Sequence, residues 1–77
     1  MVHAFVLIRT GPGASKDVRS ALSDIQSVMD AHVVAGEFDL IAEVGGEEVY
    51  DVLSTASDEV QSVSGVEETK TYISLSA

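Results

Sequence analysis

Hydrophobic and polar residues follow two different periods along the chain, and each change of period marks the boundary of an element. Runs of apolar, largely β-branched residues predict four strands, over Val2 to Arg9, Val28 to Val34, Asp39 to Val44 and Val66 to Leu75. Apolar residues at helical spacing predict two helices, over Ser15 to Ser27 and Glu47 to Val63. The apolar stripe of the second helix is expected to consist of Val49, Val52, Leu53, Ala56, Val60 and Val63.

The short connection between the second and third strands determines the topology. Only a few residues, including Gly36, separate these strands, so they are expected to form an antiparallel hairpin. Right-handed βαβ connections then interleave the two halves into one antiparallel sheet of strand order 4-1-3-2, with both helices on one face. The sequence therefore predicts an α+β, ferredoxin-like fold, formed as a single domain by residues 1–77.

The first strand is apolar on both of its faces. Ala4, Val6 and Ile8 point to one side, and Phe5 and Leu7 point to the other, beside a histidine and an arginine. Two helices cover only one face of a four-stranded sheet, which leaves the second face as an apolar patch. We therefore expect self-association through this face, as in a dimeric α+β barrel. The alternative is a solvated face with singly exposed apolar residues.

Composition narrows the classes of function. Thirteen acidic residues against four basic ones give a net charge of −9, which disfavours direct binding to nucleic acid. A hydrophobic content of 45% indicates a folded domain, and few lysines are typical of a high-salt cytoplasm, although a mesophilic source stays open. No apolar run approaches the ~20 residues needed to cross a bilayer, and no secretory signal is visible. A cytoplasmic protein without membrane contact is expected.

The residue types of common catalytic and metal sites lack the required spacing. The chain has no cysteine, and its two histidines, His3 and His32, have no further ligands at metal-site spacing. No serine lies in a Gly-x-Ser-x-Gly elbow, and the "GPG" and "GG" segments lack the pattern of a phosphate loop. The sequence therefore predicts no catalytic residue, no metal site and no cofactor.

The segment "AGEFD" between the second and third strands is the best candidate for a binding site. Gly36 permits a positive φ or a close backbone approach, Phe38 adds an aromatic ring, and Asp39 begins the next strand. An amino acid carries a carboxylate and an ammonium group, which free backbone amides near Gly36 and the Asp39 carboxylate could bind. A plain hairpin turn is the alternative.

Three motifs resemble a known family. The strand "AFVLIRT" is followed by "GPG" and a helix, "VVAGEFDLIAEV" resembles a V-x-G-x-[YF]-D-hydrophobic segment, and "SGVEETKTYISL" resembles a G-V-x-x-[ST]-x-T-hydrophobic ending. Together they resemble the effector-binding RAM domain of Lrp/AsnC regulators, which is related in fold to ACT domains. The similarity covers nearly the whole chain.

The resemblance implies a domain that dimerises through its sheet, assembles further into octamers in many members, and binds amino acids at contacts between dimers. It also implies the ligand-binding residues Gly36, Glu37, Phe38, Asp39, Thr69 and Thr71. Full regulators carry an N-terminal helix-turn-helix domain, which this sequence does not show. We therefore expect a stand-alone RAM domain that co-assembles with full-length Lrp/AsnC-type regulators.

Two other functions remain compatible with the same fold. One is a small enzyme of the dimeric α+β barrel type, in which His3 or His32 would supply the only imidazoles. The other is a purely structural oligomer that has lost its ligand site.

Overall fold

The computed structural model describes residues 1–76 and confirms the predicted order of elements. The strands and helices are β1 (Val2–Thr10), α1 (Ser15–Ser23), β2 (Val28–Val33), β3 (Leu40–Gly46), α2 (Val49–Ser54), the π-helical segment η1 (Thr55–Val60) and β4 (Val66–Ile73). Helix α1 is four residues shorter than predicted. After Ser23 the N–H groups of Asp24 and Ile25 bond to carbonyls three residues back, at 3.2 and 3.0 Å, so the helix tightens and ends.

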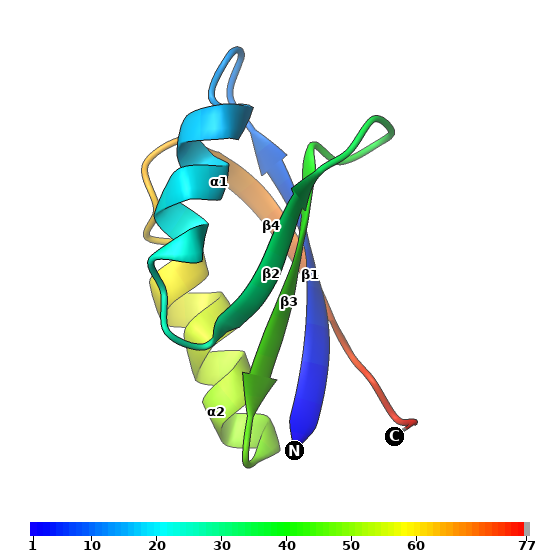
Figure 1. The fold of residues 1–77 in the computed structure, drawn as a ribbon. Helices are drawn as coiled ribbons and strands as arrows, with labels where there is room; N and C mark the ends of the chain where they lie inside the picture. Colours follow the sequence, from blue (N-terminus) through cyan, green and yellow to red (C-terminus); the bar gives the residue numbers. More distant parts are fainter. Residues whose placement is uncertain (77) are drawn as a thin grey trace.

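The four strands form one antiparallel sheet in the order β2-β3-β1-β4, which is the predicted order read from the other edge. Both helices lie on the same face of this sheet, as Figure 1 shows. β1 is central, so residues far apart in sequence meet beside it: Val6 lies opposite Ala42 on β3 and opposite Thr71 on β4. This is the α+β, ferredoxin-like fold.

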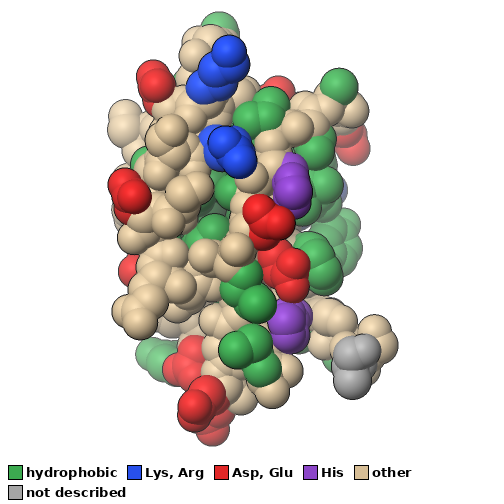
Figure 2. All heavy atoms as spheres, in the orientation of Figure 1, with side chains coloured by type: hydrophobic (Ala, Val, Ile, Leu, Met, Phe, Trp, Pro, Cys, Tyr) green, Lys and Arg blue, Asp and Glu red, His purple; other side chains and the backbone are tan. Residues whose placement is uncertain are grey.

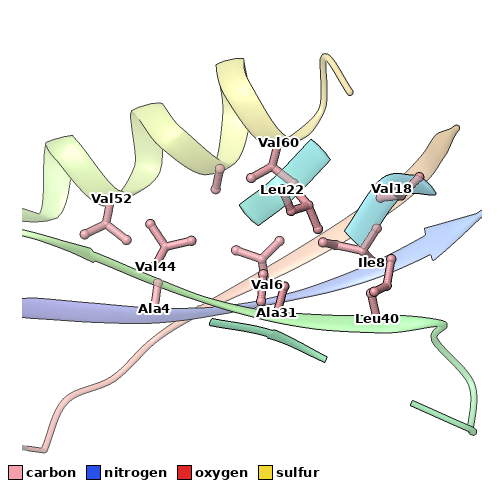
Figure 3. Close-up of a cluster of buried hydrophobic side chains, with 12 residues drawn as sticks. Ala4, Val6, Ile8, Val18, Leu22, Ala31, Leu40, Val44, Val52 and Val60 are labelled. Atoms are coloured by element: carbon pink, nitrogen blue, oxygen red, sulfur yellow. The ribbon is translucent and has the colours of Figure 1, made fainter. Parts of the chain in front are cut away.

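The core lies between the sheet and the two helices. Alternate residues of β1 and β3 point toward the helices and are fully buried, among them Val6 and Val44. Val18 and Leu22 from α1 close the layer from the other side (Figure 3). Most of the core side chains are alanine or valine, so the layer is thin and depends on close packing of the helices against the strands.

The second helix buries a narrower stripe than its sequence predicts. Val52, Ala56 and Val60, spaced four residues apart, are buried, whereas Val49 and Leu53 are 47% and 43% exposed. Two residues of the predicted apolar stripe, Val49 and Leu53, therefore lie outside the buried core of the described fold. Val49 and Leu53 both lie in α2, before the π-helical segment η1 begins at Thr55.

No helix of residues 1–76 covers the second face of the sheet, which is substantially apolar, as predicted. Phe5 lies between Glu43 and Tyr72 across the strands, and Leu7 lies between Ile41 and a lysine. Phe5 is 42% exposed and Tyr72 is 56% exposed. We call the surface formed by Phe5, Leu7, Ile41 and Tyr72 the outer sheet face.

Candidate functional site

The connection from β2 to β3, residues 34–39, is an open hairpin that is tied to β1. The Val34 N–H donates to the Asp39 carbonyl at 2.9 Å, and the Asp39 N–H donates to the Ile8 carbonyl at 2.9 Å. Gly36 lies at the tip of the hairpin, between Val34 and Asp39. Its φ is not positive, and a Cβ built on it would meet no described atom within 4 Å. The sequence suggested a positive φ or a close backbone approach as the reason for a glycine here, and neither is found within one subunit. The space beside Gly36 is open.

Phe38 anchors the hairpin against the end of the sheet. Its side chain is only 8% exposed, and the Arg9 guanidinium lies over the ring, 4.8 Å from the centroid. Lys70 approaches the same ring at 5.9 Å. The aromatic ring therefore packs between the hairpin and two cations from β1 and β4.

Arg9 joins three segments of the chain at this point. Its Nη1 donates to the Glu37 carbonyl at 2.8 Å, and its Nε donates to Glu68 Oε1 on β4 at 2.9 Å. The hydrogen bond with Glu68, and the nearby negative charges of Glu68, Glu37 and Asp39, raise the pKa of Arg9 above its usual value. Arg9 therefore stays charged and holds the hairpin to the sheet over the physiological pH range.

The Asp39 side chain bonds to Thr10, the last residue of β1. Its Oδ2 accepts the backbone N–H of Thr10 at 2.8 Å and the Thr10 hydroxyl at 3.3 Å. The same hydroxyl lies 3.0 Å from Ser15 Oγ at the start of α1. One oxygen of the predicted ligand carboxylate thus already serves the fold, by joining the ends of β1, the hairpin and α1.

A hollow of about 230 Å³ lies beside this hairpin, next to the outer sheet face. Its walls are mainly apolar, and it is lined by Leu7, Val34, Ala35, Gly36, Glu37, Phe38 and Ile41. Sequence reasoning identified Gly36, Glu37 and Phe38 but missed Leu7 and Ile41. The alternation of β1 already placed Leu7 on this face, whereas Ile41 reaches it only through its pairing with Leu7, which needs the strand register.

Thr69 and Thr71 lie on the opposite face of the sheet from the Phe38 ring. Their strand partners are Ile8 and Val6, which are buried beneath the helices, and directly paired residues point to the same side. Thr69 Oγ1 accepts a hydrogen bond from Gln61 Nε2 at 3.0 Å. One subunit therefore does not bring these threonines to the hairpin, and a role for them in ligand binding stays a prediction.

The histidines are paired with single carboxylates. His3 Nδ1 lies 2.8 Å from Glu43 Oε2, and His32 Nε2 lies 3.0 Å from Asp30 Oδ2. Among residues 1–76 no three or more histidine, cysteine, aspartate or glutamate side chains are grouped so that they could hold a metal ion. We interpret these two pairs as polar contacts on the surface of the sheet.

Comparison with known proteins decides the family. Residues 3–77 match the Lrp/AsnC ligand binding domain. The chain belongs to this family. An uncharacterized helix-turn-helix-type transcriptional regulator of Pyrococcus furiosus is 32% identical over 74 residues, which make up 92% of this chain and 49% of that protein. The Lrp/AsnC domain described here thus spans about half the length of the curated relatives it matches.

Solved structures agree with the fold of the Lrp/AsnC domain. The crystal structure of TTHA0845 from Thermus thermophilus is 30% identical, with a TM-score of 0.93 over 100% of this chain and 96% of that one. The transcriptional regulator NMB0573 from Neisseria meningitidis, solved as a complex with L-Met, shares the fold at 17% identity. Its TM-score is 0.85 over 97% of this chain and 50% of that chain. No helix in residues 1–76 is long and apolar enough to cross a membrane.

Proposed function

We propose that this Lrp/AsnC domain is a non-enzymatic cytoplasmic module that binds an amino acid, or a related small molecule, where subunits meet. Binding is coupled to self-assembly and to co-assembly with full-length Lrp/AsnC-type regulators. The observation that carries the proposal is the hollow beside Gly36, which is apolar, open, and continuous with an uncovered apolar sheet face. The single domain, residues 1–77, is the proposed functional unit.

The first step is dimerisation through the outer sheet face. Phe5 and Tyr72 are adjacent on neighbouring strands and both are partly exposed. A second copy placed face to face would remove both aromatic side chains from water, with the two sheets about 10 Å apart. Because Leu7 and Ile41 belong both to this face and to the hollow, the dimer contact and the proposed ligand site share a wall.

The second step is recognition of the ligand's charged groups at the hairpin. Backbone amides near Gly36 supply donors for a carboxylate, and the Glu37 side chain, which is exposed, supplies an acceptor for an ammonium group. Leu7, Phe38 and Ile41 supply an apolar surface for the ligand's side chain. The L-Met bound by NMB0573 is a ligand of this chemistry, which supports an apolar amino acid here.

The site is completed by a neighbouring subunit. The hollow is open on the side of Gly36, and Thr69 and Thr71 lie on the other face of their own sheet. In this proposal these threonines reach a ligand only from a different subunit. A ligand held between subunits stabilises the assembly through its preferential binding to the assembled state.

The charge of the domain supports partnership with a DNA-binding protein. A net charge of −9 disfavours direct contact between these 77 residues and DNA, so in this proposal an effect on transcription acts through a separate DNA-binding domain. The full-length relatives supply the kind of regulator with which this domain would assemble.

Isothermal titration with each proteinogenic amino acid, combined with light-scattering measurement of mass, tests the proposal. Saturable heat from at least one amino acid, together with an increase in assembly, is expected. Absence of both for every amino acid would overturn the effector-binding part.

A further inference from the structure

The lysines and arginines of the chain form two separate pairs. Arg9 and Lys70 both approach the Phe38 ring, so they belong to the hairpin site. Lys16 and Arg19 lie three residues apart on α1, on the helix side of the molecule. Residues three apart on a helix are neighbours, with about 5–6 Å between their Cβ atoms, so these two positive charges lie close together.

Arg19 is fixed at the open edge of the sheet. β2 is an edge strand, and the Arg19 Nε donates to the Ala31 carbonyl on it at 2.8 Å. This bond occupies one of the five N–H donors of the guanidinium and orients the rest of the fork. Arg19 also blocks part of the unpaired strand edge, which accounts for one cation at this position. It does not account for the second cation, Lys16.

Lys16 and Arg19 have no acidic partner within residues 1–76. The chain has thirteen acidic residues, yet the salt bridges formed in the described part of the chain involve His3, Arg9 and His32 instead. Two like charges on one side of a helix repel each other unless an anion lies between them. In a protein of net charge −9, an unneutralised pair of cations is the feature that needs explanation.

These cations line a hollow of about 530 Å³ between α1 and β2. Ser20 adds a hydroxyl, and Val33 adds an apolar wall. His32 lines the hollow at the β2 edge, while its ring lies on the side of its strand partner Ile41, where its Nε2 contacts Asp30. Figure 2 shows basic side chains in blue on the helix side of this view, with red acidic side chains and purple histidines beside them over the strands. Asp30 is the carboxylate nearest to His32, but it does not line the hollow.

We infer that the α1–β2 hollow binds a small molecule bearing carboxylate or phosphate groups, through Lys16 and the Arg19 guanidinium. Both residues project from one helix, and β2 holds the Arg19 side chain in place, so an anion would meet one oriented guanidinium beside an exposed lysine. None of the residues lining this hollow lines the hollow at the hairpin. The inference is therefore independent of the proposed amino-acid site and would give the domain a second ligand.

NMR titration of the backbone amides and the Arg19 Nε–H group tests this inference directly. Inorganic phosphate and citrate serve as probes, each compared with sodium chloride at equal ionic strength. We expect saturable shifts concentrated at Lys16, Arg19, Ser20 and His32 with at least one probe. Lys16→Gln should weaken that binding about tenfold, because it removes one charge-assisted hydrogen bond.

Matched variants separate a site from general attraction of anions. Lys70→Gln removes the same charge at the other cation pair and should leave the binding unchanged. Arg19→Lys keeps the charge but loses the planar fork, and it should weaken binding while circular dichroism shows an intact fold. Shifts equal to those in sodium chloride, or equal losses from Lys16→Gln and Lys70→Gln, would overturn the inference.

Discussion

The side chain of Asp39 accepts the backbone N–H of Thr10 at 2.8 Å, across 29 residues of sequence. This bond joins the end of β1 to the hairpin that contains Gly36. The candidate ligand loop is therefore held in place by one of the residues that the sequence assigned to ligand binding. Its position relative to the outer sheet face is set before any ligand arrives.

Replacing Asp39 should destabilise the domain. Asp39→Ala leaves the N–H of the buried Thr10 without its acceptor, which costs about 1–3 kcal/mol of unfolding free energy. Glu37→Gln is the matched control, because Arg9 bonds to the Glu37 backbone carbonyl and not to its side chain. Urea unfolding followed by circular dichroism measures both. Equal stability of Asp39→Ala and wild type would show that the bond to Thr10 contributes nothing.

Removal of the Phe38 ring should loosen the hairpin. Phe38→Ala takes away a nearly buried aromatic side chain and its contact with Arg9, and a loss of about 3 kcal/mol is expected. Tyr50→Ala removes an aromatic ring of similar size from an exposed position on α2 and should change stability by less than about 0.5 kcal/mol. Thermal unfolding of the two variants makes the comparison. If they were equally stable, the packing role of Phe38 would be refuted.

The two valines of α2 test how that helix packs. Val52→Ala removes methyl groups from a fully buried position and should cost about 2 kcal/mol. Val49→Ala makes the same chemical change at a position that is 47% exposed, so its cost should stay within about 0.5 kcal/mol. Urea unfolding of both variants measures the difference. A larger loss for Val49→Ala would contradict the packing of α2 described here, unless assembly buries Val49.

Dimerisation through the outer sheet face should fail when a charge is placed on it. Phe5→Glu puts a carboxylate beside Glu43 on the proposed interface, where desolvation and like-charge repulsion both oppose association. Val49→Glu adds the same charge to the exposed surface of α2 and should leave the dimer intact. Light scattering should give a monomer mass for Phe5→Glu alone. A dimer that survives this substitution would place the interface elsewhere.

Sequence reasoning succeeded where a local period determines the outcome. The alternation along β1 was sufficient to place Phe5 on a face opposite Val6, and this face is uncovered by the helices. The short link containing Gly36 was sufficient to pair β2 with β3, and the right-handed βαβ connections then gave the strand order. These features follow from the geometry of a strand and from the length of a loop.

The remaining features depend on long-range register or on tertiary packing. The bond between Arg9 and Glu68 spans 59 residues, and a shift of register lies between Arg9 and Thr10, so no local pattern reveals it. Thr69 was assigned to the site by motif alone, and only its pairing with Ile8 shows that it faces the helices. Likewise, Val49 fits an α-helical stripe, and only the tertiary packing of α2 shows that it is 47% exposed.

Gly36 offers the most direct test of a ligand site at the hairpin. Its φ is compatible with other residues, and a side chain there would meet open space. The free energy of unfolding of Gly36→Val should therefore lie within about 0.5 kcal/mol of the wild-type value. The added methyl groups would nevertheless occupy the entrance to the hollow. Gly36→Ala should give a smaller effect in the same direction.

Calorimetric titration of Gly36→Val beside wild type, with mass measured by light scattering in the same samples, decides the central claim. We predict that wild type binds at least one amino acid and gains mass on binding, and that the equally stable Gly36→Val variant loses both responses. Unchanged amino-acid binding and assembly in Gly36→Val would contradict a ligand site at this hairpin.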